Sequence, residues 1–152
     1  MNTEKNNNFI RYGSLIGLVI ALLGMYYLYS NEYLFSKNPL SIIIQILAII
    51  LMVFARITFG IRSFHAPANI TRGKLITNGV YKYFRHPIYA SLIYFFSTSL
   101  ISFPIKNTIT PVILIIIGLS IRIFFEEQAL ISHYKEYKKY SEKTKRIIPF
   151  IL

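Results

Sequence analysis

Four long apolar stretches organise the chain. They run from Tyr12 to Tyr29, from Leu40 to Gly60 with Arg56 inside it, from Ile88 to Phe103, and from Ile109 to Phe125. None of them alternates polar and apolar residues with a period of two, so membrane β-strands are not favoured. A helix needs roughly 20 residues to cross the bilayer core, and the stretches reach or approach that length. The pattern predicts an all-α, polytopic membrane protein with four transmembrane helices.

The segments between the stretches predict how these helices connect. The segment Pro104–Thr108 is short, so the third and fourth helices are expected to form an antiparallel hairpin. Pro87 suits the first turn of the third helix. Arg85 and His86 would then lie at its N-terminus, where free backbone N–H groups favour an anion.

The segment after the fourth stretch combines apolar and basic residues. Lysines there alternate with an apolar and aromatic stripe at intervals of three and four residues, which is Leu130, Ile131, Tyr134, Tyr137 and Tyr140. This pattern predicts an amphipathic C-terminal helix that lies on the membrane surface. The apolar end of the chain after Arg146 predicts that the tail folds back onto the core.

The positions of the charges indicate an orientation in the membrane. The 152 residues are 54% hydrophobic, carry a net charge of +11, and are expected to form one domain, 1–152. Thirteen of the 17 basic residues lie before the first stretch, in the middle loop or in the tail, whereas Lys37 and Lys106 alone lie in the other two connections. By the positive-inside rule, both termini and the middle loop are expected in the cytoplasm, at an inner (plasma) membrane. Nucleic-acid binding is not favoured, because the excess charge follows the topology.

The composition excludes several kinds of chemistry. The chain has no Cys and no Asp, which excludes disulfides, thiolate metal sites and cysteine nucleophiles and disfavours a Mg²⁺ or Ca²⁺ site. His65, His86 and His133 lack metal-ligand spacing, so no metal is expected. Phosphate-loop, dinucleotide, zinc-protease and serine-hydrolase motifs are also missing from the sequence. Arg, Glu, His and Tyr remain as candidate functional groups.

Polar residues gather at the predicted cytoplasmic ends of the helices. Arg122 and Glu126 are four residues apart, so they share a helix face and can pair. Glu126 and Glu127 oppose the helix dipole at the end of an apolar stretch, which makes them functional candidates or a simple polar stop. Arg85 and His86 have an equally simple interpretation, as a positive flank and a capping residue.

Three segments resemble the isoprenylcysteine carboxyl methyltransferase family of integral-membrane enzymes, including its bacterial members. Leu75–Tyr89 is similar to that family's G-x-Y followed by R-H-P-x-Y, and Glu126-Glu127-x-x-Leu130 with Tyr137 and Tyr140 resembles its E-E-x-x-L and Y-x-x-Y. Thr144-x-Arg146-x-x-Pro149 is similar to its closing T-x-R-x-x-P. The resemblance covers about residues 75–149, half of the chain. It departs from the pattern at Tyr134-Lys135, where family members often have Phe-Gly and one residue more.

The resemblance implies S-adenosylmethionine as methyl donor, bound in a cytosolic pocket of the third and fourth helices and the tail. The cofactor-binding residues that it implies are Tyr81, Arg85, His86, Pro87, Tyr89, Glu127, Tyr137, Tyr140 and Arg146. Phospholipid N-methyltransferases and membrane steroid reductases look distantly similar, so the reaction class stays open.

Methyl transfer mainly requires that donor and acceptor are positioned and water excluded. A carboxylate acceptor is ionised at neutral pH and needs a cation, which Arg122 or Arg56 can supply. An amine acceptor needs a base, for which Glu126 and His86 are candidates. We predict Arg122 and Glu126 as catalytic residues and favour a carboxylate on a lipophilic or amphiphilic acceptor. The alternatives are a phospholipid or amine N-methyltransferase, a nicotinamide-dependent reductase, and a non-enzymatic membrane protein with a basic, partner-recruiting tail.

Overall fold

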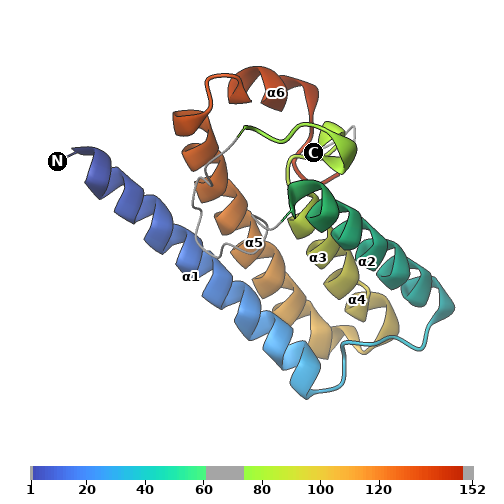
Figure 1. Cartoon of the computed structure of the whole chain (residues 1–152). Coiled ribbons are helices and arrows are strands. Elements are labelled where there is room, and N and C mark those ends of the chain that lie inside the picture. The colour runs from blue at the N-terminus through green and yellow to red at the C-terminus, as the bar shows by residue number, and fades with distance from the viewer. Residues whose placement is uncertain (1, 61–73, 149–152) are drawn as a thin grey trace.

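The computed structural model describes residues 2–60 and 74–148, with side chains from residue 8 onward, and this part of the chain forms helices and no strand (Figure 1). The helices are α1 (Asn2–Ser30), α2 (Pro39–Phe59), the 3-10 helix η2 (Gly79–Lys82), α3 (Pro87–Ser97), α4 (Ser99–Ser102), α5 (Ile105–His133) and α6 (Tyr137–Lys143). The predicted all-α class is confirmed.

Three helices are long and apolar enough to cross a membrane. They are Asn8–Ser30 within α1, Pro39–Phe59 (α2) and Ile105–His133 (α5). At most 44% of the most apolar window of each helix is buried within the protein. Apolar side chains that no other part of the chain covers are expected where lipid surrounds a helix. The chain is therefore an integral membrane protein.

The third apolar stretch, predicted as a span from Ile88 to Phe103, forms two shorter helices. A continuous helix from Pro87 to Ser102 would be about 24 Å long, less than the bilayer core of about 30 Å. The helix is also interrupted at Thr98, whose hydroxyl donates to the Phe95 carbonyl at 2.6 Å and accepts from Gln45 Nε2 at 3.0 Å. By length, three helices rather than four qualify as spans in the described chain.

The last long helix is longer than its apolar stretch. We predicted Ile109–Phe125, but α5 begins at Ile105 and ends at His133. The predicted loop Pro104–Thr108 is therefore mostly helical, with Pro104 as the N-cap. Glu126 and Glu127 lie inside α5 rather than at its C-terminal end, and both side chains find polar partners there.

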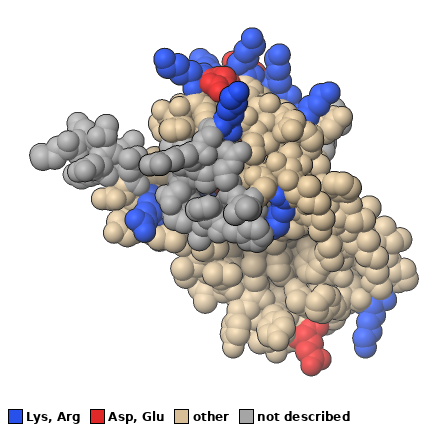
Figure 2. Space-filling model, viewed as in Figure 1, with Lys and Arg blue, Asp and Glu red and all other residues tan. Residues whose placement is uncertain are grey.

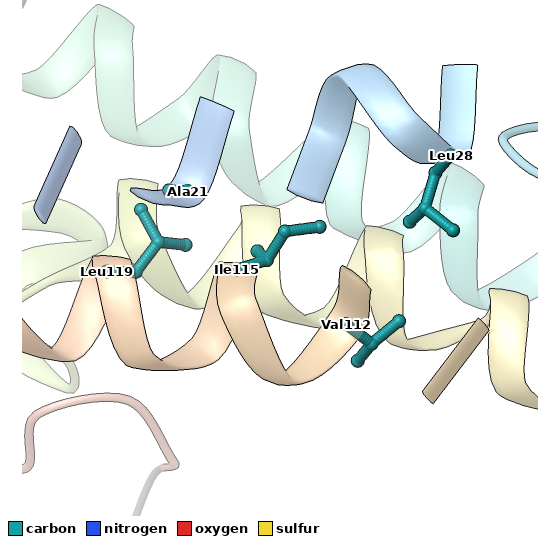
Figure 3. Close-up of a cluster of buried hydrophobic side chains, with 5 residues drawn as sticks. All are labelled: Ala21, Leu28, Val112, Ile115 and Leu119. Carbon is teal, nitrogen blue, oxygen red and sulfur yellow. The ribbon is translucent and has the colours of Figure 1, made fainter. Parts of the chain in front are cut away.

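Close packing of α1 along α5 forms the core of the molecule. Ala21 and Leu28 of α1 meet Val112, Ile115 and Leu119 of α5 in one buried cluster (Figure 3). A Cβ atom on Gly17 would lie 2.6 Å from the Gly118 carbonyl oxygen, so glycine is needed at this crossing. Small residues of this kind let membrane helices approach closely.

Buried hydroxyl and amide groups join α2 to α3 and α4 at the end of the molecule away from α6. Gln45 Nε2 donates to the Leu34 carbonyl at 2.8 Å and to Thr98 Oγ1 at 3.0 Å. Ser102 donates to the Ser41 hydroxyl at 2.8 Å. Since lipid offers no hydrogen bonds, these partners satisfy groups that would otherwise be costly to bury.

The basic residues gather at the end that carries α6, as Figure 2 shows for the face in view. Lys138, Lys139 and Lys143 belong to α6 itself, whereas Lys37 precedes α2 and Lys106 lies in the first turn of α5. Arg62, His65 and Arg72 of the predicted cytoplasmic loop lie outside the described residues.

Candidate functional site

The N-terminus of α3 forms as the sequence predicts. Pro87 occupies the first turn and His86 is the N-cap. The preceding segment turns at Gly79, which has φ +56° and whose Cβ, if present, would lie 2.8 Å from Thr58 Oγ1 of α2. A left-handed conformation in so narrow a space favours glycine. The turn places Tyr81 to His86 at the end of α2 and α3.

Residues 145–147 of the tail return to this turn, whereas Pro149 and Phe150 of the apolar end that was predicted to fold back lie outside the described residues. The backbone N–H of Arg85 donates to the Lys145 carbonyl at 2.7 Å, and that of His86 donates to the Arg146 carbonyl at 3.1 Å. Tyr94 on α3 donates its hydroxyl to the Ile147 carbonyl at 2.6 Å. The tail therefore lies beside the beginning of α3.

Glu127 is the centre of a first polar cluster. Its carboxylate receives Arg146 Nη2 at 2.8 Å, lies 2.9 Å from Arg85 Nε and 3.4 Å from His86 Nε2, and accepts from the Tyr137 hydroxyl at 3.3 Å. Glu127 takes part in every ion pair found among the described residues. One buried carboxylate thus joins α5, the beginning of α3 and the tail.

Arg85 connects this cluster to α6. Its Nη1 donates to the carbonyls of Ser141 and Thr144, the second at 2.9 Å, and so satisfies backbone groups at the C-terminal end of α6. Its Nε is close to Glu127, but the N–H does not point along the line to the oxygen. The Arg85 guanidinium therefore binds both the backbone of the tail and the Glu127 carboxylate.

The predicted amphipathic tail helix is interrupted, and its stripe from Leu130 to Tyr140 is not continuous. α5 ends where the Tyr134 N–H bonds the Leu130 carbonyl, and α6 begins only at Tyr137. The turn buries Tyr137 completely against Glu127, and burial followed by this negative charge raises the pKa of the Tyr137 phenol. It also brings the Tyr140 hydroxyl to the Tyr81 carbonyl at 2.7 Å.

Tyr89 is the centre of a second cluster. Its hydroxyl donates to Glu126 Oε2 at 2.7 Å and accepts from Arg122 Nη2 at 3.2 Å and Nε at 3.3 Å. Arg122 Nη1 also donates to the Ser14 carbonyl of α1 at 3.4 Å. The two residues that we predicted to pair directly, Arg122 and Glu126, are joined here through a tyrosine from α3.

The two clusters are neighbours. The rings of His86 and Tyr89 stack with centroids 5.8 Å apart. Tyr81 is buried, and burial followed by the negative charge of Glu126 raises the pKa of its phenol, while the charge of Arg56 lowers it. The charge of Glu126 in the second cluster therefore acts on Tyr81. Tyr140, whose hydroxyl donates to the Tyr81 carbonyl, lies next to Tyr137 of the first cluster.

The structure brings the predicted site residues together at one end of the molecule, at the junction of α3, α5 and the tail. It also places Ser14, which no sequence pattern predicted for the site, beside Arg122. Nothing in the sequence marks this serine, since it lies near the start of the first apolar stretch and far from the motifs that begin at Leu75. Only the packing of α1 on α5 shows that it lies beside Arg122.

Comparison with known protein families finds a match. Residues 40–137, well over half of the 152 residues, match a family model described as phospholipid methyltransferase. No curated protein and no solved structure matches the chain. The matched family is related to the isoprenylcysteine carboxyl methyltransferases that the motifs resemble. With the three apolar helices and the polar clusters at one end of them, this match shows that the chain belongs to the phospholipid methyltransferase family of membrane methyltransferases.

Proposed function

We propose that the protein transfers a methyl group from S-adenosylmethionine to an acceptor carried by a lipid or another amphiphile. The observation that carries this proposal is the Tyr89 hydroxyl, which joins Arg122 to Glu126 within helices that face lipid. Ionisable residues at such a position are costly, so they indicate function. The family match supports methyl transfer as the reaction.

The residues of the first cluster suit the cofactor. S-adenosylmethionine carries a carboxylate, an ammonium group and an adenine, which cations, carboxylates and aromatic rings recognise. The Arg146 side chain is 57% exposed although it is paired with Glu127, so it is accessible to a ligand carboxylate. Tyr81, Tyr137 and Tyr140 supply the neighbouring rings.

Within this cluster the residues have different roles in our proposal. The bound cofactor supplies a methyl group on a positively charged sulfur. Glu127 orients Arg85, His86 and Arg146 around it, while Pro87 fixes the start of α3 and hence the direction of His86 and Tyr89. These groups position the donor and keep water away, which is the main requirement of the reaction.

The second cluster suits the acceptor. For a carboxylate acceptor, as in the isoprenylcysteine carboxyl methyltransferases, Arg122 holds the ionised oxygen and no base is needed. For a phospholipid amine, Glu126 accepts the proton that the amine loses. The family match favours the phospholipid amine as acceptor. The Arg122–Glu126 pair favours it as well, because the two side chains present one charge of each sign, as a zwitterionic headgroup requires.

We also propose the orientation that the charges predict, with both termini and α6 at the cytoplasmic face of the plasma membrane. In this arrangement α3 and α4 complete a fourth, shorter crossing. Residues 1–152 act as one domain, in which residues 75–149 carry the cofactor site.

Calorimetry with S-adenosylhomocysteine on detergent-purified protein tests the cofactor, and binding is expected. Radiolabelled methyl transfer to a prenylcysteine analogue and to phosphatidylethanolamine then tests the acceptor. A methyl ester releases methanol in alkali, whereas an N-methyl group is stable. A protein that binds no S-adenosylhomocysteine and methylates neither acceptor would contradict the proposal and favour the reductase or the non-enzymatic alternative.

Variants of the second cluster test the site. We expect Arg122→Ala and Glu126→Gln each to lower kcat/KM by about 100-fold, because each removes a charge that acts on the reacting groups. Glu142→Gln, an exposed carboxylate of α6, is the matched control and is expected to leave kcat/KM unchanged. Wild-type rates in both site variants would remove Arg122 and Glu126 from the site.

A further inference from the structure

Ser14 has a buried hydroxyl that no described group satisfies. The residue is 1% exposed, and its Oγ has no hydrogen-bond partner in the structure. A serine in a helix usually donates to a carbonyl three or four residues earlier. Ser30, Ser91, Ser132 and Ser141 do so, at 2.7 to 3.2 Å. Among the described residues, Ser14 has the one buried hydroxyl without a hydrogen-bond partner, and such a group requires an explanation, such as strain, a functional role or an ordered water.

The position of Ser14 connects this hydroxyl to the second cluster. Ser14 lies on the face of α1 that packs on α5, and its carbonyl accepts from Arg122 Nη1 at 3.4 Å. Gly17, one turn later, lets α1 approach so closely that a Cβ there would be 3.1 Å from Arg122 Cγ. Ser14 therefore lies beside Arg122, in a wall of the Arg122–Tyr89–Glu126 cluster that is contributed by α1.

This wall is not part of the matched family segment. The match begins at residue 40, after the end of α1 at Ser30. α1 therefore brings to the site a group that neither the family match nor the motifs predict.

We propose that Ser14 is a binding residue for the acceptor, and that its hydroxyl donates to an anionic oxygen of an amphiphile beside the Arg122 guanidinium. Both candidate acceptors carry such an oxygen, as a carboxylate or as a phosphate. The assignment of this cluster to the acceptor rests on the proposed function. Ser14 is buried between helices that face lipid. The ligand is therefore expected to carry an apolar chain that packs against these helices, which a small free anion does not have.

A binding experiment that needs no turnover tests this proposal. Full-length protein in dodecyl maltoside is titrated with dodecyl phosphate or dodecanoate, and the rise in Tm is followed, since a ligand of the folded state stabilises it. We expect a saturable rise for wild type, and for Ser14→Ala an apparent Kd raised by about 10- to 100-fold, as for a lost hydrogen bond to a charged group. The probe with the lower Kd distinguishes phosphate from carboxylate.

Ser120→Ala is the matched control, because it makes the same change at an exposed position of α5 and is expected to bind as wild type does. Ser14→Ala without ligand is expected to keep the wild-type Tm, because the lost hydroxyl had no partner. A lower Tm would indicate a structural hydroxyl, and equal Kd values for Ser14→Ala and wild type would indicate that only an ordered water bonds to it. Either result would overturn the proposal, as would a wild type that binds neither probe.

The same preparations separate this proposal from the proposed function. Ser14-dependent binding without methyl transfer would contradict the enzyme and keep the anion site. Methyl transfer with a KM for the acceptor that is unchanged in Ser14→Ala would keep the enzyme and overturn the role of Ser14.

Discussion

At the scale of single residues, two adjacent glutamates have separate environments. Glu127 is buried and holds cations from α3 and the tail, whereas the half-buried Glu126 accepts from Tyr89. Neighbouring positions on a helix point about 100° apart, so they meet different elements. One carboxylate therefore organises the first cluster while the other faces the second.

Glu127→Gln tests this organising role. Removing one partner of a buried ion pair leaves the other charges uncompensated and typically costs 3–5 kcal/mol. Because the Arg146 side chain is 57% exposed and screened by solvent, we expect a loss of about 2–3 kcal/mol in the free energy of unfolding. Chemical unfolding in detergent measures it, with the exposed Glu142→Gln as control. Equal stability of the two variants would remove Glu127 from the organising role.

Tyr140 predicts a pH dependence. Burial raises the pKa of its phenol from 10.0 to about 12, and the protonated hydroxyl donates to the Tyr81 carbonyl. Since the folded state holds this proton more tightly than the unfolded state, the stability from Tyr140 is complete below pH 10 and is lost as the pH rises through 12. The free energy of unfolding, measured between pH 9 and 12, is expected to fall less steeply with pH for Tyr140→Phe than for wild type. Parallel profiles for both proteins would contradict the assignment.

At the scale of elements, the crossing of α1 and α5 depends on glycine. Gly17→Val would bring a side chain against the Gly118 carbonyl and push the helices apart, and overpacking of this kind costs about 1–3 kcal/mol. Ile16→Val, on the exposed face of the same helix, is the control. Thermal unfolding in detergent compares the two, and a Gly17→Val protein as stable as Ile16→Val would show that the close approach is not required.

This crossing also positions the second cluster, because Ser14 and Arg122 meet across it. We therefore expect Gly17→Val to weaken acceptor binding more than cofactor binding. Calorimetry with S-adenosylhomocysteine, measured beside the acceptor KM, separates the two effects. A larger change in the cofactor Kd would contradict this order.

At the scale of the whole molecule, the orientation in the membrane is directly testable. The chain contains no Cys, so a single cysteine can report its side of the membrane without background. We expect Lys138→Cys to react with an impermeant maleimide only from the cytoplasm, and Lys37→Cys only from outside, because Lys37 follows the first of the four proposed crossings (α1) and Lys138 follows the last (α5). Labelling of both from one side would contradict the predicted topology.

The sequence by itself determined the helical class, the long apolar spans, the basic end and the start of α3 at Pro87. These properties depend on local composition, helix length and the missing N–H of proline, all of which are readable along the chain. The motif residues also indicated a methyltransferase of the correct broad kind before their partners were known.

Only the tertiary structure decided which partner each ionisable group takes. It joined Arg122 to Glu126 through Tyr89, made Glu127 rather than Glu126 the centre of the ion pairs, interrupted the helices at Thr98 and Tyr134, and placed Ser14 beside Arg122. In each case the deciding contacts join residues that are distant in the sequence or belong to different helices. The local sequence pattern cannot specify such contacts, because they depend on how the helices cross and on which buried polar groups lack another hydrogen-bond partner.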